Sequence, residues 1–191
     1  MNIFYSELCV IGGKTAEENV DALIEGGAKN IELMLDGIAW NSFEFRMDEL
    51  AAMLHKKGVT YSVHSPVWDI NLTSESSYIR KAVLDCYKSS ILFAHKLGAV
   101  SVVLHPGFCQ SSTFDKGTAK GRAKEAIWEL AEFNKPYGCQ LLIENVGTKQ
   151  TGIFTFSEFL HFLDDMPSDL NYLVDIGHAH LCGWDIISLI K

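Results

Sequence analysis

The chain has 191 residues, of which 48% are hydrophobic and 21% charged, a balance typical of a globular protein with a sizeable core rather than a disordered chain. The formal net charge of −8 argues against a broad nucleic-acid-binding surface, which needs dense lysine and arginine. The sequence contains no apolar run of about 18 residues, the length that would predict a membrane span. The first residues lack the pattern of a secretion signal. We therefore expect a cytoplasmic protein that binds no membrane.

Short apolar runs alternate with amphipathic runs along the chain. In chain order we expect a strand at 3–5, a helix at 15–26, a strand at 30–35, a helix at 47–57, a strand at 60–64, a helix at 77–97, a strand at 100–104, a helix at 118–137, a strand at 140–143, a helix at 155–164, a strand at 171–174 and a helix at 185–191. Capping-box pairs begin two of these helices, Thr15 with Glu18 and Thr155 with Glu158.

Strands that alternate with helices at this spacing favour βαβ units and a parallel sheet. The sequence contains neither G-x-G-x-x-G after the first strand nor a Walker A motif, which disfavours a nucleotide-binding doubly wound fold. We therefore expect an α/β fold of the TIM (β/α) barrel type, truncated to about six βα units from the usual eight. We expect one domain over residues 1–191 that lacks strands 7 and 8. A fragment, a naturally short product and a second copy that covers the open edge are the alternatives.

Side chains that can bind a metal ion lie at the ends of four successive predicted strands. His64 ends the third strand, His105 follows the fourth, Glu144 follows the fifth, and Asp175 and His178 follow the sixth. In a parallel barrel these ends share one rim, where active sites lie. Imidazoles and carboxylates together suit zinc, manganese, iron or cobalt better than calcium. We therefore predict a divalent-metal site, with Glu144 able to bridge if more than one ion is bound.

Other candidates are weaker. Trp68, in the loop after His64, is predicted to stack on a sugar or a base, although packing under the loop is an equal alternative. His180 is a candidate for contact with the ligands or the substrate. Lys14 and Lys149, in loops, are candidates for contact with an anionic substrate.

Four segments carry a family resemblance: VHSPVWDINLTS, VVLHPG, LLIENVG and LVDIGHAHLCGWD. Together they resemble the xylose isomerase-like TIM-barrel superfamily, which holds sugar-phosphate isomerases/epimerases and endonuclease IV-type (family 2) AP endonucleases. The resemblance runs from about the second strand to the end of the chain. It implies an enzyme with a zinc or manganese cofactor of one to three ions.

The two branches imply different roles for the same residues. Similarity to the endonuclease branch implies that His64, His105 and Glu144 hold one metal, that Glu144 bridges to a second ion shared with Asp175, and that His178 holds a third. Similarity to the isomerase/epimerase branch implies that Glu144 and Asp175 hold a single ion, that Glu144 also serves as acid/base, and that His178 contacts the substrate. Asn145, in the segment IEN, is a further candidate for substrate binding.

The segment DIGHAH and the acidic charge favour the isomerase/epimerase branch, with a sugar or sugar phosphate as substrate. The segments INLTS and GWD, and the paired His64 and His105, favour the alternative, a zinc phosphodiesterase that acts on abasic DNA. A third hypothesis is an inactive, truncated barrel.

Overall fold

One parallel sheet forms the centre of the protein. The computed structural model describes residues 2–12, 15–164 and 166–189. Within them, six strands pair in parallel in the order of the chain, which is how the sheet of a TIM barrel is built. The strands are β1 (Tyr5–Ser6), β2 (Asn30–Met34), β3 (Thr60–His64), β4 (Val102–Leu104), β5 (Leu141–Glu144) and β6 (Leu170–Leu173).

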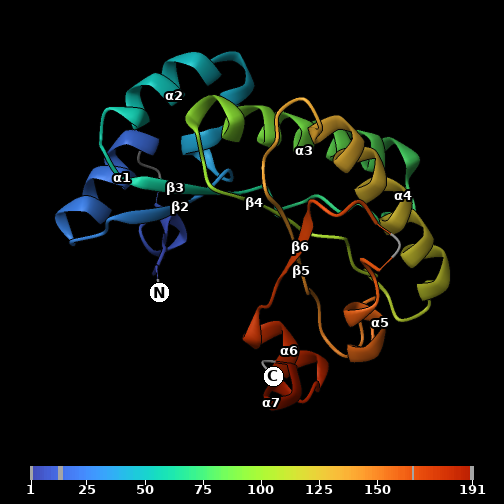
Figure 1. Cartoon of the computed structure of the whole chain (residues 1–191). Coiled ribbons are helices and arrows are strands. Elements are labelled where there is room, and N and C mark those ends of the chain that lie inside the picture. Colours follow the sequence, from blue (N-terminus) through green and yellow to red (C-terminus); the bar gives the residue numbers. More distant parts are fainter. Residues whose placement is uncertain (1, 13–14, 165, 190–191) are drawn as a thin grey trace.

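Helices connect successive strands, and two more helices follow the last strand. They are α1 (Ala16–Glu25), α2 (Met47–His55), α3 (Ser77–Leu97), α4 (Lys116–Asn134), α5 (Phe156–Leu160), α6 (Ile176–Cys182) and α7 (Ile186–Leu189). Three short 3₁₀ turns lie at η1 (Glu7–Cys9), η2 (Ile38–Trp40) and η3 (Phe43–Phe45). In Figure 1 helices α2, α3 and α4 follow one another around the sheet, while α6 and α7 gather beyond the ends of β5 and β6.

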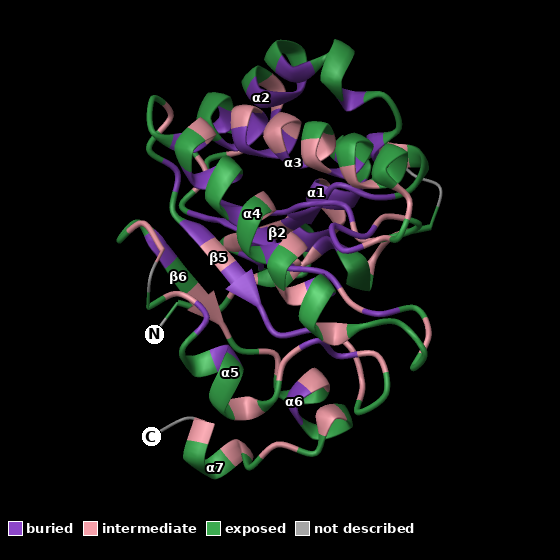
Figure 2. Cartoon of the chain, turned by 90° about the vertical axis from the view of Figure 1, so that its right-hand side faces the viewer, coloured by how far each residue is buried: buried purple, intermediate pink, exposed green. Residues whose placement is uncertain are grey.

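Burial follows the same layering. Figure 2 shows buried residues concentrated in the strands and on the inner sides of α3 and α4, with exposed residues on their outer sides. In α3 the fully buried side chains Val83, Tyr87 and Ile91 recur every four residues, so one stripe of the helix packs on the sheet. The helix ends at Gly98, whose φ of 72° favours glycine.

Most predicted elements are present, and their ends move by a few residues. Both predicted capping boxes are formed, at the starts of α1 and α5. The predicted strands at 3–5 and 100–104 are observed at Tyr5–Ser6 and Val102–Leu104. The helix predicted from 118 begins at Lys116, because Asp115 accepts a hydrogen bond from the Thr118 N–H and acts as the N-cap.

The helix predicted at 155–164 is the largest difference. It ends at Leu160, although Phe162 and Leu163 continue an apolar pattern. The hydroxyl of Tyr172, on β6, donates to the Leu160 carbonyl at 3.0 Å and accepts from the Leu163 N–H at 2.9 Å. These contacts use backbone groups that a longer helix would pair internally, so a residue distant in sequence ends α5.

Two differences concern the end of the chain. Helix α6 was not predicted; it begins after Asp175, which caps it by accepting from the His178 N–H. The predicted terminal helix is observed as α7, and residues 190–191 lie outside the described part of the chain. None of the helices in the described ranges combines the length and the apolar character that crossing a membrane requires.

Candidate metal centre

The register of the sheet brings the predicted ligands to one rim. His64 is the last residue of β3 and pairs with Val103 of β4. His105 directly follows the end of β4, so it lies near His64 at the same rim. Leu104 pairs with Ile143, which directly precedes Glu144 at the end of β5. All of these strands run parallel, so the side chains converge at their carboxyl ends, as the sequence predicted.

Glu144 is the centre of the cluster. Its Oε2 lies 3.1 Å from His64 Nε2 and 3.1 Å from His105 Nε2. The two imidazole rings meet edge to face, with centroids 5.0 Å apart and an interplanar angle of 84°. Ligand atoms around a four-coordinate zinc lie roughly 3.3 Å apart. The observed spacing is therefore close to that of a metal-ligand set.

A second group shares the same carboxylate. Glu144, Asp175 and His178 each offer a ligand atom within 4.8 Å of the other two, as do His64, His105 and Glu144. Asp175 and His178 are held by the start of α6, and both are partly buried. The arrangement thus contains two candidate metal positions with Glu144 common to both.

Backbone carbonyls determine how two of the imidazole rings are presented. His64 Nδ1 donates to the carbonyl of Ser65 at 2.8 Å, and His178 Nδ1 donates to the carbonyl of Gly147 at 3.0 Å. A hydrogen bond of this kind keeps a proton on Nδ1, so Nε2 is the nitrogen that would give up its proton to bind a metal. In His64 that Nε2 is the nitrogen that faces Glu144.

The electrostatics of the cluster favour an ionised carboxylate. Burial alone would raise the pKa of Glu144, but hydrogen bonds from His105 and His64 outweigh burial and lower the pKa to about 2. For His64, burial favours the neutral ring, but the contact with Glu144 outweighs it and raises the pKa. For His105, burial prevails, assisted by the neighbouring histidines, and the pKa is lowered.

These shifts predict how the stability of the metal-free protein depends on pH. Because the pKa of Glu144 falls from 4.5 to about 2 on folding, its carboxylate stabilises the fold above pH 4.5, and this contribution is lost as the pH falls toward 2. We expect the difference in free energy of unfolding between the wild type and Glu144→Gln to shrink over that range. Urea denaturation of both proteins in chelator, at about pH 5.5 and about pH 3, measures it. A difference that is the same at both pH values contradicts the expectation.

The donor set fits a divalent cation. Many catalytic zinc sites have this composition of two imidazole nitrogens and one carboxylate oxygen. The second group, with two carboxylates and one imidazole, suits manganese or zinc. His64 and Glu144 are buried, while His178 and Asp175 are partly exposed, so a substrate would approach from the side of α6.

The other predicted site residues lie outside this cluster. Trp68 is 49% exposed, and a Cβ added at Gly37 would lie 3.5 Å from its ring. His180 is exposed on α6. Asn145 is 1% exposed, and its carboxamide bonds to both backbone groups of Asp175. Lys149 is exposed, and Lys14 lies outside the described residues.

Sequence reasoning missed Asp36, which follows β2 at the same rim. Its carboxylate is 6% exposed and accepts from the Val67 N–H at 2.8 Å and, more weakly, from the Trp68 N–H at 3.4 Å. Burial raises its pKa, although the hydrogen bonds and the charges of His64 and His105 oppose the rise. The signal was available, because Asp36 directly follows the apolar run Leu33–Leu35, as the other candidates follow theirs.

A parallel sheet in chain order, with imidazoles and carboxylates gathered at its carboxyl rim, defines a protein of the TIM-barrel class with a candidate metal centre. The chain belongs to the xylose isomerase-like TIM barrel family, whose model matches residues 20–190. This confirms the family resemblance seen in the sequence.

Individual relatives extend the comparison. The uncharacterized protein MJ1614 of Methanocaldococcus jannaschii is 28% identical over 159 residues, which cover 83% of this chain and 61% of that protein. The structure of a D-tagatose 3-epimerase-like protein is 23% identical, with a TM-score of 0.79 over 94% of this chain and 66% of that chain. The structure of an IOLI protein with a bound zinc atom is 18% identical, with a TM-score of 0.80 over 100% of this chain and 68% of that chain. At these identities the two structures show a shared fold.

Proposed function

We propose that the chain carries the metal centre of a sugar or sugar-phosphate isomerase/epimerase. The observation that carries the proposal is the position of Glu144, which joins the pair His64 and His105 to Asp175 and His178 at the rim where TIM barrels catalyse. Two similarities support it: one neighbour in fold is described as D-tagatose 3-epimerase-like, and another has a bound zinc atom. Because the chain spans 61% of the length of MJ1614, the activity of the whole protein is part of the proposal.

Glu144 is better suited to hold the metal than to move a proton. A general base works best with a pKa near the operating pH. In the metal-free protein the burial of Glu144 is outweighed by hydrogen bonds from His105 and His64, which lower its pKa to about 2, and a bound cation would likewise favour the ionised carboxylate. We therefore assign Glu144 the role of an anionic ligand, with zinc or manganese as the ion. When bound, a divalent ion polarises the carbonyl and hydroxyl oxygens of a sugar.

The partly buried residues supply the contacts to the substrate in this proposal. With the ion held by Glu144, His64 and His105, His178 remains available to the substrate. Its Nδ1 is bound to the Gly147 carbonyl, so it presents Nε2, and we assign it the transfer of a proton to or from the sugar. Trp68, half exposed on the loop after β3, offers an apolar ring face on which a sugar can stack.

A zinc phosphodiesterase acting on abasic DNA is the second candidate. The observation that favours it is the pair of ligand groups sharing Glu144, since two ions bridged by a carboxylate can stabilise both oxygens of an in-line displacement. The net charge of −8 weighs against a large DNA-binding surface.

One set of assays separates the candidates. Elemental analysis of the purified chain, with its length confirmed by mass, gives the number of ions per chain. Turnover is then measured on a panel of ketohexoses that includes D-tagatose, on their phosphates, and on an abasic DNA duplex at low salt, each with added Zn²⁺ or Mn²⁺. We expect one ion and sugar turnover. Two or more ions with nicking of abasic DNA supports the second candidate, and a metal-free chain that acts on none of these substrates contradicts both.

A further inference from the structure

Two buried asparagines each form a pair of hydrogen bonds with both backbone groups of one residue in a neighbouring loop at the rim. We call such a pair a bracket. Asn71 donates from Nδ2 to the Phe108 carbonyl at 2.7 Å and accepts from the Phe108 N–H at 3.1 Å. Asn145 donates to the Asp175 carbonyl at 2.9 Å and accepts from the Asp175 N–H at 2.8 Å. In each case the carboxamide satisfies both backbone groups of one residue, as a neighbouring strand would.

Each bracket connects two loops that carry candidate metal ligands. Asn71 lies in the loop that follows His64, and Phe108 lies in the loop that follows His105. Asn145 directly follows Glu144, and its partner Asp175 is itself a candidate ligand. Each bracket therefore ties together two loops whose ligands come from different strands.

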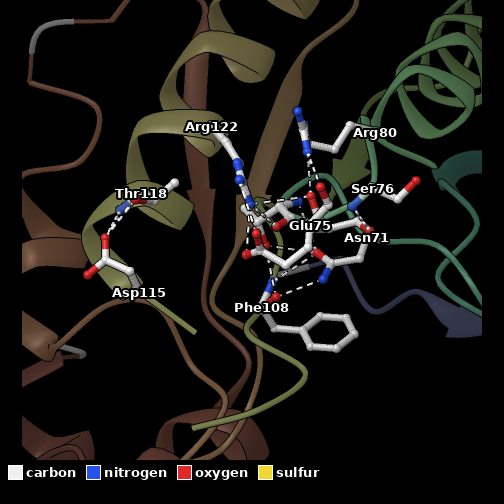
Figure 3. A network of polar contacts seen from close by, with 10 residues as sticks. Asn71, Glu75, Ser76, Arg80, Phe108, Asp115, Thr118 and Arg122 are labelled. Carbon is white, nitrogen blue, oxygen red and sulfur yellow. Dashed lines mark hydrogen bonds and ion pairs between the residues drawn. The ribbon is translucent and has the colours of Figure 1, made fainter. Parts of the chain in front are cut away.

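Further polar contacts support the bracket formed by Asn71. The hydroxyl of Thr73 lies 2.8 Å from the Phe108 carbonyl and 2.9 Å from Asn71 Oδ1. Farther out, Arg122 on α4 pairs with Glu75 at 2.9 Å and anchors the same loop, as Figure 3 shows. The loop after β3 is thus attached both to the loop after β4 and to α4.

We propose that Asn71 and Asn145 are positioning residues for the metal centre. Asn71 holds the His105 loop against the His64 loop, and Asn145 holds Asp175 beside Glu144. The inference rests on the proposed metal function and adds residues that act through the backbone rather than by touching the ion. Loss of such supporting contacts typically weakens metal affinity about 10- to 100-fold.

The chain contains a matched control at the other end of the sheet. Asn134 brackets Cys139 in the same way, donating to its carbonyl at 2.7 Å and accepting from its N–H at 3.1 Å. Asn134 is fully buried and joins the end of α4 to the start of β5, opposite the end that carries Glu144. Replacing it removes the same chemistry without disturbing the rim.

The experiment compares Zn²⁺ affinity, by chelator competition, among the wild type, Asn71→Ala, Asn145→Ala and Asn134→Ala. Urea denaturation of the metal-free proteins measures the loss of fold stability in each. We expect about 10- to 100-fold weaker binding for the two rim variants and a change within about twofold for Asn134→Ala, even where all three lose stability. Thr73→Val removes only the hydroxyl contacts and is the milder variant if Asn71→Ala does not fold; we expect it to weaken binding a few-fold. Equal effects at the two ends, or unchanged affinity in the rim variants, overturns the inference.

A second measurement needs no metal. Ring signals in ¹³C–¹H spectra report the surroundings of individual histidines in the metal-free proteins. We expect Asn71→Ala to shift the signals of His105 and leave those of His178, and Asn145→Ala to shift those of His178. If the wild type binds no Zn²⁺, the proposed metal function fails and these spectra alone decide the positioning roles; ring signals that do not move contradict them.

Discussion

Replacing Glu144 with alanine is expected to weaken the affinity for Zn²⁺ by more than about 100-fold, beyond the loss typical of supporting residues. The carboxylate is the one side chain common to both ligand groups, and its Oε2 contacts His64 and His105 at 3.1 Å each. Without it, neither group keeps three ligands. Chelator competition at neutral pH measures the affinity, and urea denaturation in chelator establishes that the variant is folded.

Glu158→Ala is the matched control for Glu144. Hydrogen bonds from Lys120 and the Thr155 backbone N–H lower the pKa of Glu158 to about 2 as well, but this residue is exposed in the first turn of α5. We expect its Zn²⁺ affinity to stay within about twofold of the wild type, since it contacts no candidate ligand. If Glu144→Ala binds Zn²⁺ as the wild type does, Glu144 is not a ligand.

Replacing Gly107 with alanine is expected to lower the free energy of unfolding by about 3 kcal/mol or more. Gly107 has a φ of +110°, which side-chain-bearing residues rarely adopt. An added Cβ would lie 2.6 Å from the Thr73 side chain and 2.9 Å from Asn71 Oδ1. Because these atoms belong to the bracket on Phe108, we also expect weaker metal binding.

Gly58→Ala separates backbone strain from steric overlap. Gly58 also has a positive φ, +68°, but a Cβ there would meet nothing within 4 Å. We expect a loss of about 1 kcal/mol from the backbone alone. Urea denaturation of both variants measures the two losses. Losses of equal size would show that the loop moves without cost to accommodate the methyl group that Gly107→Ala adds.

The sequence predicted the elements whose signals are local. Strand β3 and helix α3 were predicted at their observed bounds, and α3 carries a long amphipathic stripe that is followed by a glycine. The end of α5 could not be predicted, since the hydroxyl of Tyr172 on β6 competes for its backbone groups. Helix α6 is short and takes its start from the Asp175 cap, a signal visible in the sequence that we interpreted only as a metal ligand.

The convergence of the site was predictable, and its internal arrangement was not. Parallel strands in chain order place His64, His105 and Glu144 at one rim whatever the details of packing. The carbonyl contacts that orient His64 and His178 depend on loop conformation, which the residue types do not determine. The same is true of Asn145, whose carboxamide bonds to both backbone groups of Asp175 in the next loop.

The most direct test of the metal centre is a crystal structure of the chain grown with Zn²⁺, with diffraction data collected on both sides of the zinc absorption edge. We expect an anomalous peak bound by Glu144 together with His64 and His105, or with Asp175 and His178, at roughly 2.0–2.2 Å from the nitrogen and oxygen ligands. Clear density for these side chains with no anomalous peak among them, at a zinc concentration well above the measured dissociation constant, would contradict the account.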